Sequence, residues 1–286
     1  MILITGATGR TGTVAAKLLA AQGHKVRGLV RNPEKAAALE AAGVELAVGD
    51  AGDAAAVRAA LAGVEKIAII LPNGEKQLAL ETQLADLAAA AGAKHILKVS
   101  SLESVAGAPN PVHKTHWDSE EHIRSLGTAW TMVRPSFYLQ NFLGNAATIK
   151  AENKFYYPFG DQGGAVMTDA RDVGIFIAHV FTTPGHENQS YDITSHDRLT
   201  FHEAAAVISN ELGRKIEYVP QDPAAYKAVL GKFVTNKWHL DAVCDIFAEI
   251  SHGYMAQTTN TFREVTGREP VGLAQFIREF AAAFRA

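Results

Sequence analysis

Three glycines near the N-terminus have the spacing of a phosphate-binding turn. Gly6, Gly9 and Gly12 follow the apolar run 1–4 and precede a long segment rich in alanine and leucine. This order predicts a strand, a glycine turn and a helix. We expect Gly6 to let the chain turn sharply, Gly9 to leave room for a pyrophosphate beside the backbone, and Gly12 to bring the helix close to the sheet.

The chemistry that such a turn offers is anion binding. The free N–H groups and the positive end of the helix attract a phosphate. The spacing is G-x-x-G-x-x-G rather than G-x-G-x-x-G, so the strand before it and the helix after it carry much of the argument. The alternative is a glycine-rich turn that binds nothing, which this context disfavours. The expected cofactor contacts in the turn are Gly6, Thr8, Gly9, Arg10, Thr11 and Gly12.

Arg31 stands at the tip of the second expected strand, 25–30, where a dinucleotide-binding fold faces the adenine ribose. A carboxylate there would bind the ribose 2′-hydroxyl of NAD, whereas an arginine suits the 2′-phosphate of NADP. No acid occupies the position, and Lys35 adds a second positive charge, although Glu34 lies beside it. We therefore expect NADP(H) as the cofactor. The alternative is that Arg31 is a solvated loop residue.

The elements that must position these residues alternate along the first half of the chain. β-rich runs and helical stretches follow one another, which indicates a parallel sheet covered by helices on both faces. Further strands are expected at 44–48, 66–71, 95–99 and 130–133, and helices at 53–62 and 75–91. Ligands of such sheets bind beyond the carboxyl ends of the strands. The strand tips beyond Arg31 are Asp50, Ala51, Leu71, Pro72, Ser100 and Ser101.

Four of these tip residues are expected to contact the cofactor. Asp50 is placed to accept a hydrogen bond from the adenine amino group, and Ala51 to offer a backbone group to the ring. The alternative for Asp50 is a helix N-cap, although Asp53 is better placed for that. Leu71 and Pro72 are expected to form an apolar wall near the nicotinamide ribose, or else to be ordinary packing at the end of a strand.

The second half of the chain has a different texture. Short aromatic and glycine-rich segments, such as 155–160, alternate with single helices, and a capping-box spacing from Thr200 to Glu203 opens one of them. We expect strands at 190–194 and 215–219 and a helix at 272–284. The chain is thus predicted to be α/β, with a Rossmann-type NADP-binding domain at 1–150 and a smaller α+β substrate lobe at 151–286 that does not fold independently.

Composition excludes several classes of protein. The 286 residues carry a formal charge of −3, which disfavours nucleic acid as the main partner, and no apolar run approaches the ~20 residues that span a bilayer. The single Cys244 rules out an internal disulfide framework and lies in an apolar segment, where we expect a buried, inert thiol. The eleven histidines are scattered, so no metal site is expected. Because the chain starts on a core strand, we expect no targeting peptide and a cytoplasmic protein.

Together these residues resemble the NmrA-like family of atypical short-chain dehydrogenase/reductases, and most of all its bacterial branch of triphenylmethane and quinone reductases. The motifs that carry the resemblance are 5–9 with Gly12, 30–32, His116-Trp117-x-x-Glu120, Thr131-x-x-Arg134-Pro135 with Phe137 and Asn141, Asp169-x-Arg171-Asp172, 184–187 and 199–201. The resemblance covers the chain to about Val219. It implies a Rossmann-type fold and an NADP cofactor. The family also contains a redox-sensing regulator that binds dinucleotide without turning it over.

One departure from the wider class affects the expected chemistry. Ordinary short-chain dehydrogenases carry Tyr-x-x-x-Lys, in which the tyrosine protonates a developing alkoxide. Here His116 stands where many relatives carry the lysine, and Val112 stands four residues earlier. Either hydride goes to an acceptor that needs no strong proton donor, or no hydride is transferred.

His116 is the first catalytic candidate, because it can donate to the nicotinamide ribose or carboxamide or relay a proton. The alternative is a helix-surface histidine paired with Glu120 at i+4. Ser100 is placed to bind a substrate carbonyl or else to cap the next segment, and Tyr138 and His113 are further proton-donor candidates. Aromatic side chains supply material for an apolar pocket, and those expected to bind substrate are Trp117, Phe137, Tyr138, Phe142 and Tyr156.

These observations favour an NADPH-dependent, flavin-independent oxidoreductase that transfers hydride to a small, apolar, electrophilic acceptor, which is quinone-like, an iminium or dye-like. The first alternative is a non-catalytic protein that senses NADP(H). The second is a nucleotide-sugar epimerase or dehydratase, against which the missing tyrosine and lysine count. Beyond the small-molecule substrate we expect no nucleic-acid or membrane partner, and the chain as a monomer or homodimer.

Overall fold

A computed structural model describes residues 1–196, 198–253 and 257–285, and the chain divides into two units. The first unit comprises Met1–Pro135 with Ala170–Asp192, and the second comprises Ser136–Asp169 with Ile193–Ala286. The first segment of this unit therefore ends at Pro135, whereas the boundary expected from the sequence is at residue 150, and the segment 170–192 completes the unit.

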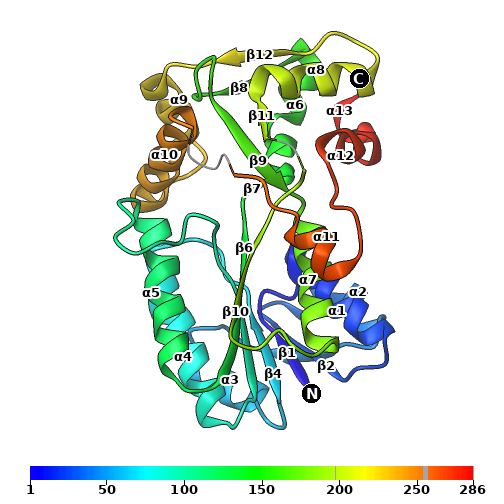
Figure 1. Ribbon diagram of the computed structural model, residues 1–286, viewed down its shortest axis with the longest axis vertical. Coiled ribbons are helices and arrows are strands. Elements are labelled where there is room, and N and C mark those ends of the chain that lie inside the picture. Colours follow the sequence, from blue (N-terminus) through cyan, green and yellow to red (C-terminus); the bar gives the residue numbers. More distant parts are fainter. Residues whose placement is uncertain (197, 254–256, 286) are drawn as a thin grey trace. The chain divides into compact units, whose positions relative to one another are not determined.

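A mostly parallel sheet forms the centre of the first unit (Figure 1). Its strands are β1 (Ile2–Ile4), β2 (Val26–Val30), β3 (Glu45–Val48), β4 (Lys66–Ile69), β5 (His95–Val99), β6 (Ala129–Pro135) and β10 (Gln189–Ile193). They lie in the order β10-β6-β5-β4-β1-β2-β3, and each pair from β6 to β3 is parallel. Since the strand order reverses between β1 and β4, ligands are expected beyond the carboxyl ends of these two strands.

The central strands are buried on both faces. Leu3 and Ile4 of β1, Ile67 and Ile69 of β4, and Ile96 of β5 have no exposed surface. Strands of a parallel sheet are covered by helices on each side, so their sequences are nearly continuous apolar runs. This explains why the run 95–99 could be predicted with the bounds that β5 has.

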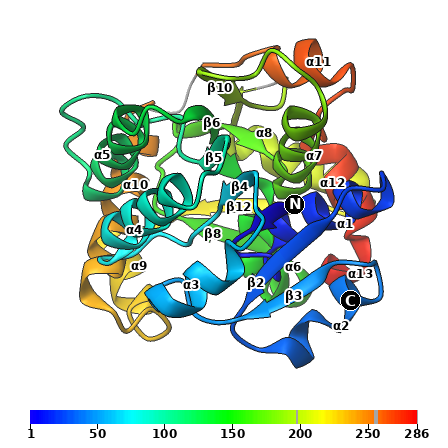
Figure 2. The same cartoon turned by 90° about the horizontal axis from the view of Figure 1, so that it is seen from below.

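Helices cover both faces of this sheet. They are α1 (Arg10–Ala21), the 3₁₀ helix η1 (Pro33–Ala36), α2 (Ala37–Glu40), α3 (Ala54–Ala60), α4 (Gln77–Ala90), α5 (Pro111–Ser125) and α7 (Ala170–Thr182). Figure 2 shows α1 and α7 on one face and α4 and α5 on the other, and within each pair the helices pack together. The predicted doubly wound α/β fold is confirmed.

The close packing of α7 on α1 accounts for the return of 170–192 to the first unit. A Cβ added to Gly174 would lie 2.7 Å from both the carbonyl oxygen of Thr11 and the Cβ of Val14, so only glycine lets the helices approach this closely. The hydroxyl of Thr11 also donates to the carbonyl of Ala170 at 3.1 Å. A linear boundary at residue 150 could not represent this, because the contact joins segments far apart in the sequence.

The second unit has two smaller sheets. β7 (Phe137–Tyr138), β9 (Gly164–Thr168) and β11 (Arg198–Thr200) form one, and β8 (Lys154–Tyr157) and β12 (Glu217–Pro220) form the other. The helices are the 3₁₀ helix η2 (Leu139–Asn145), α6 (Ala146–Glu152), α8 (Phe201–Leu212), α9 (Pro223–Leu230), α10 (Lys237–Ser251), α11 (Thr261–Thr266), α12 (Leu273–Glu279) and α13 (Ala281–Phe284).

Two details of this unit test local predictions. The capping box is present, since the Thr200 hydroxyl accepts from the N–H of Glu203 and the Glu203 carboxylate accepts from the N–H of Thr200. The single helix expected at 272–284 is instead α12 and α13, which meet at Phe280. None of the described helices combines the length and apolar character needed to cross a membrane.

Aromatic rings dominate the core of the second unit. Tyr157 and Phe159 stack with ring centroids 4.8 Å apart, and Phe159 lies 4.3 Å from Phe201. Each large ring removes roughly 150–250 Å² from water, so a few of them can stabilise a unit with short strands.

Candidate functional site

The turn after β1 has a shape that glycine is needed to form. Gly6 has a φ of +58°, and a Cβ there would lie 2.4 Å from the carbonyl oxygen of Ile70. A Cβ on Gly12 would lie 2.3 Å from the carbonyl oxygen of Gly6, whereas one on Gly9 would lie 3.1 Å from it. Gly6 and Gly12 are therefore required by the fold of the turn, and Gly9 is less constrained by the protein itself.

The start of α1 presents its backbone N–H groups at this turn. Gly9 is the N-cap and has no side chain to occupy the helix end, and Thr8, Gly9 and Arg10 are exposed. The N–H groups of Arg10, Thr11 and Gly12 precede the first intrahelical bonds, so they are available to donate to an anion. Because the Thr11 hydroxyl is bonded to Ala170, Thr11 can contribute through its backbone only. The cradle fits the diphosphate of a dinucleotide.

Thr5 joins the ends of β1 and β4 at the point where the strand order reverses. Its N–H donates to the carbonyl of Ala68 at 3.0 Å, and its hydroxyl oxygen accepts from the N–H of Ile70 at 2.8 Å. The residue is fully buried. These two hydrogen bonds hold the glycine turn beside the tip of β4, where Leu71 and Pro72 follow the strand.

The tip of β2 carries the expected positive charges. Arg31 directly follows β2, and Lys35 lies in η1; both side chains are exposed. The side chain of Asn32 accepts from the N–H of Glu34 at 2.9 Å and shapes the turn between them. Two accessible cations at this tip suit a phosphate on the adenine ribose.

The remaining residues at the strand tips differ in their exposure and in the hydrogen bonds that they already make. Asp50 is exposed, and its carboxylate accepts from the N–H of Gly52 at 2.8 Å, while Asp53 caps α3 by accepting from Ala55 and Ala56. The N-cap alternative for Asp50 is therefore wrong. The carbonyl of Ala51 accepts from the Gln83 side chain at 3.0 Å. Leu71 is half-buried against the core, and Pro72 is exposed.

His116 lies inside the first unit, not on a helix surface. Its residue is 5% exposed, its Nδ1 lies 2.8 Å from the Nζ of Lys98, and its Nε2 lies 3.1 Å from the Oδ1 of Asn73 in the loop after β4. Burial and then the charge of Lys98 hold the pKa of His116 well below its ordinary value. The surface alternative is wrong, because Glu120 binds other partners.

Glu120 is fully buried and holds two arginines. Arg134 donates through Nε at 2.9 Å and through Nη2 at 2.5 Å, and Arg124 donates at 2.7 Å. Burial alone would raise the pKa of Glu120, but the hydrogen bond and charge of Arg134 outweigh burial and leave it below its ordinary value. The Ser100 hydroxyl also bonds to this carboxylate.

Ser100 therefore has a role that neither sequence interpretation included. Its hydroxyl lies 3.5 Å from that of Ser104, its N–H donates to the carbonyl of Val133, and the residue is 5% exposed. The N-cap of α5 is Asn110, so Ser100 does not cap that helix. Ser100 belongs to the polar network around Glu120, and its hydroxyl is already engaged there.

A second buried carboxylate lies in the loop after β5. The Ser101 hydroxyl donates to Glu103 Oε2 at 2.6 Å, and His113 Nε2 lies 3.8 Å from the same oxygen. Burial raises the pKa of Glu103 to about 7 and lowers the pKa of His113 to about 4. At neutral pH His113 is uncharged, so it is no strong proton donor.

Lys98 and Glu81 were missed by the sequence interpretation. Both side chains have 0% exposure, and the Lys98 Nζ lies 3.1 Å from a carboxylate oxygen of Glu81. A signal existed, because Lys98 lies within the apolar run 95–99 of a strand expected to be buried on both faces. A charged residue in such a strand requires a buried partner.

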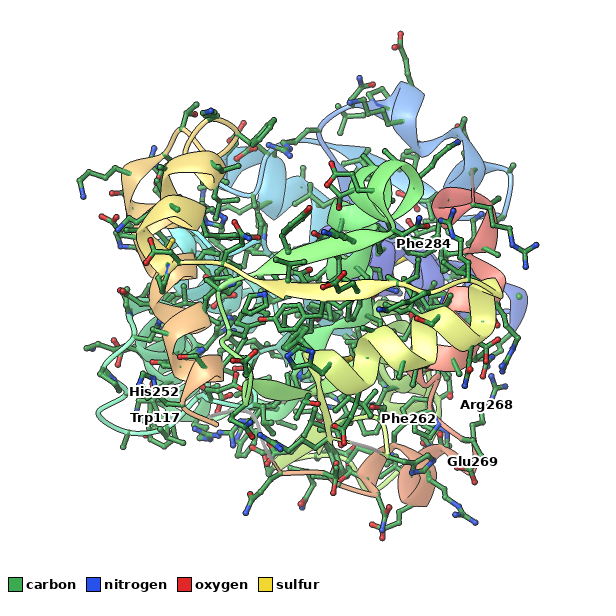
Figure 3. The ribbon with its side chains drawn as sticks, turned by 90° about the horizontal axis from the view of Figure 1, so that it is seen from above. Trp117, His252, Phe262, Arg268, Glu269 and Phe284 are labelled. Carbon is green, nitrogen blue, oxygen red and sulfur yellow. The ribbon has the colours of Figure 1, made fainter. Side chains whose placement is uncertain are left out.

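The expected substrate-binding aromatics do not form one group. Trp117, which Figure 3 labels on α5, is half-buried and has the Arg124 guanidinium 5.6 Å from its ring. In the second unit Phe137 and Phe142 belong to the aromatic core, and Phe142 has no exposed surface. A substrate could not touch Phe142, so this expectation is wrong for that residue.

Tyr138 and Tyr156 lie in the same unit and are only half-buried. The Tyr156 hydroxyl donates to a carboxylate oxygen of Glu152 at 2.6 Å, and this bond to a carboxylate raises the pKa of Tyr156. Since Phe155 and Tyr157 point into the core, the alternation of β8 turns Tyr156 to the other face. Their roles toward a substrate stay predictions.

Two further expectations concern a metal site and the reactivity of the Cys244 thiol. Among the described residues, no group of three or more histidine, cysteine, aspartate or glutamate side chains is arranged to hold a metal ion. Cys244 on α10 is half-buried rather than fully buried, and burial raises the pKa of its thiol. A raised pKa leaves less thiolate, which agrees with an unreactive cysteine.

The first unit thus brings together, at the carboxyl ends of β1 and β4, a glycine turn with exposed helix N–H groups, an apolar tip and a buried histidine. The model of the NmrA-like family matches residues 1–268. NAD(P)H azoreductase of Xenophilus azovorans is 32% identical over 286 residues, which cover 100% of both chains. Quinone oxidoreductase 2 of Escherichia coli is 29% identical over 280 residues and 97% of each chain.

Two solved structures have the same fold and a bound cofactor. The NADPH complex of the Escherichia coli quinone oxidoreductase matches with a TM-score of 0.88 and 27% identity, covering 98% of this chain and 100% of that one. The NADP(H) complex of Citrobacter sp. triphenylmethane reductase matches with a TM-score of 0.85 and 25% identity, covering 98% and 99%.

Proposed function

We propose that this chain, which belongs to the NmrA-like family, is an NADPH-dependent reductase that delivers hydride to a small, apolar, electrophilic acceptor. The acceptor class is quinone-like, iminium or dye-like. The observation that carries the proposal is the glycine cradle at the reversal of strand order, with Arg31 exposed at the next strand tip. The end-to-end likeness to an NAD(P)H azoreductase supports it.

Different residues of the first unit would bind different parts of NADPH. The N–H groups of Arg10, Thr11 and Gly12 would hold the diphosphate, and Arg31 with Lys35 would hold the 2′-phosphate. Leu71 and Pro72 give the β4 tip an apolar surface for the nicotinamide end. NADPH, when bound, supplies the hydride.

The buried groups near the β4 tip explain why the acceptor should be activated. Val112 is buried and has no proton to give, and His116 is neutral at pH 7 because its pKa lies well below the ordinary value. Reduction of a simple ketone needs a strong proton donor for the alkoxide, whereas a quinone or a dye cation does not. The protein's main contribution is therefore orientation of the reactants.

The first test measures NADPH oxidation by purified protein against quinones, azo dyes, triarylmethane dyes and simple ketones, with a binding titration in parallel. We expect turnover with activated acceptors and none with ketones. Tight NADPH binding without turnover of any acceptor would contradict the reductase and favour a dinucleotide sensor.

A second test concerns the choice of cofactor. Arg31→Ala should weaken NADPH binding about 10-fold or more, because charge-assisted hydrogen bonds to the 2′-phosphate are lost, and should change NADH binding less than about 2-fold. Arg58→Ala is the matched control, since Arg58 is exposed and lies in the last turn of α3, the end of that helix away from the β3 tip. Equal losses for both cofactors in Arg31→Ala would remove the 2′-phosphate assignment.

A further inference from the structure

A fully buried lysine in the central sheet has no role in the proposed binding of NADPH. Lys98 lies on β5 between β4 and β6, and its side chain is 0% exposed. Burying an ammonium group costs several kcal/mol unless a partner compensates for it. Glu81 of α4 is that partner, with 0% exposure and a carboxylate oxygen 3.1 Å from the Lys98 Nζ.

The same ammonium group contacts His116. The Lys98 Nζ lies 2.8 Å from the Nδ1 of the imidazole. An ammonium group has three donors and no acceptor, so Nδ1 must accept with its lone pair. A neutral imidazole carries one ring proton, and that proton is then on Nε2.

The opposite side of the ring agrees with this assignment, and the amide nitrogen of Gln77, which is 3.4 Å from both ring nitrogens, favours neither tautomer. The Nε2 lies 3.1 Å from the side-chain oxygen of Asn73, which can only accept. The other tautomer would direct an N–H at the Lys98 ammonium group and a lone pair at the Asn73 oxygen. The charged imidazolium would place a second buried cation beside the first, and burial and the charge of Lys98 lower the pKa of His116 accordingly.

We propose that Lys98 is a positioning residue that, held by Glu81, fixes His116 as the Nε2–H tautomer, so that the ring presents one hydrogen-bond donor to an oxygen of bound NADPH at its nicotinamide end. The ligand oxygen would take the place of the Asn73 oxygen at the β4 tip. The choice of ligand rests on the proposed function, whereas the tautomer does not. His116 then acts as a fixed donor and not as a proton source.

The tautomer can be measured directly by ¹⁵N NMR of histidine-labelled protein, with His116→Asn assigning the signal. In the wild type at neutral pH we expect a protonated Nε2 and an unprotonated Nδ1. An Nδ1–H tautomer or a charged ring would overturn the proposal, and this result needs no variant of the buried pair.

Variants then test whether Lys98 is the cause. Glu81→Gln combined with Lys98→Met removes both charges at nearly constant volume, which avoids leaving one buried ion alone. We expect the His116 signals to shift toward a mixture of tautomers. Asn73→Ala should keep the Nε2–H form, and so should Lys66→Met, a lysine control at the amino end of the neighbouring strand β4. A pure Nε2–H form of His116 in the double variant Glu81→Gln/Lys98→Met would refute the role of Lys98. Loss of the Nε2–H form in Asn73→Ala would refute it as well.

NADPH titration connects the tautomer to binding. The double variant Glu81→Gln/Lys98→Met should weaken NADPH affinity roughly 3- to 10-fold, which is the value of one hydrogen bond. This loss should vanish when the same two substitutions are made in a His116→Ala background. An equal loss in that background would show that the pair acts without His116. If the wild type bound no NADPH, the proposed function would fail while the NMR result still decided the tautomer.

Discussion

Replacing Glu103 by glutamine should make the protein more stable above neutral pH and leave its stability unchanged in acid. The side chain of Glu103 is 3% exposed, and burial raises its pKa to about 7 from an ordinary value of 4.5. The neighbouring His113 cannot compensate with a positive charge, because burial lowers its pKa to about 4. Glutamine keeps the shape of the protonated acid and carries no charge.

The sign follows from proton binding in the two states. Between pH 4.5 and about 7 the unfolded chain has released the Glu103 proton while the folded chain keeps it, so wild-type stability falls as pH rises through this window. The difference between the two pKa values, at about 1.4 kcal/mol per unit, corresponds to about 3 kcal/mol. This contribution is complete below 4.5 and absent above about 7.

Urea unfolding of wild type and Glu103→Gln, once below pH 4.5 and once at mildly alkaline pH, would measure this difference. Trp117 and Trp130 belong to the first unit and Trp238 to the second, so tryptophan fluorescence measured in a Trp238→Phe background reports on unfolding of the first unit. We expect the variant to gain about 3 kcal/mol relative to wild type at the alkaline pH and nothing at the acidic one. Glu40→Gln, at an exposed position on α2, serves as the control and should stay within about 0.5 kcal/mol at both. The same difference between Glu103→Gln and wild type at both pH values would refute the reasoning.

Two further substitutions test other parts of the first unit. Gly12→Ala should destabilise the glycine turn and weaken NADPH binding, because the new Cβ would lie 2.3 Å from the carbonyl oxygen of Gly6. Gly23→Ala is the control: its φ of +85° also strains an alanine, but away from the turn, so it should lower stability and leave NADPH affinity unchanged. Normal NADPH affinity in Gly12→Ala would contradict the role of the turn in binding. Glu120→Gln should lower the free energy of unfolding by about 3–5 kcal/mol, since Arg134 would keep its charge without its buried partner. Thermal unfolding measures this loss, and Glu121→Gln, an exposed neighbour on the same helix, should change stability by less than about 1 kcal/mol. Equal effects of the two glutamate substitutions would show that the burial of Glu120 does not matter.

The fold class and the family were predictable because their signals are local. Gly6 and Gly12 are required where the chain turns and where the start of the helix meets the carbonyl of Gly6, and Ile96, Leu97 and Val99 of β5 are apolar because the strand is buried on both faces. The φ of +58° at Gly6 and the approach of Gly12 to Gly6 act within a few residues of the chain, and burial of a strand leaves its mark in the strand's own residues. The family and fold predictions are confirmed, and the roles of the cofactor-binding residues stay predictions.

Aromatic composition could not separate pocket from core. Phe142 and Tyr156 both looked like candidates for an apolar pocket, yet Phe142 is completely buried in the second unit and Tyr156 turns to the outer face of β8. An aromatic ring has the same hydrophobicity in either place. Only the packing of the segments around it decides which of its surfaces stay accessible.

The sequence by itself determined the sheet, the glycine turn, the arginine at the tip of β2 and the missing tyrosine and lysine, because residue type and spacing specify each of them. Only the tertiary structure decided the state of His116. Its neighbours Lys98, Glu81 and Asn73 come from β5, α4 and the loop after β4, and no spacing on α5 reports their approach. Burial and a nearby charge set the protonation of a side chain, and both exist only once the chain has folded.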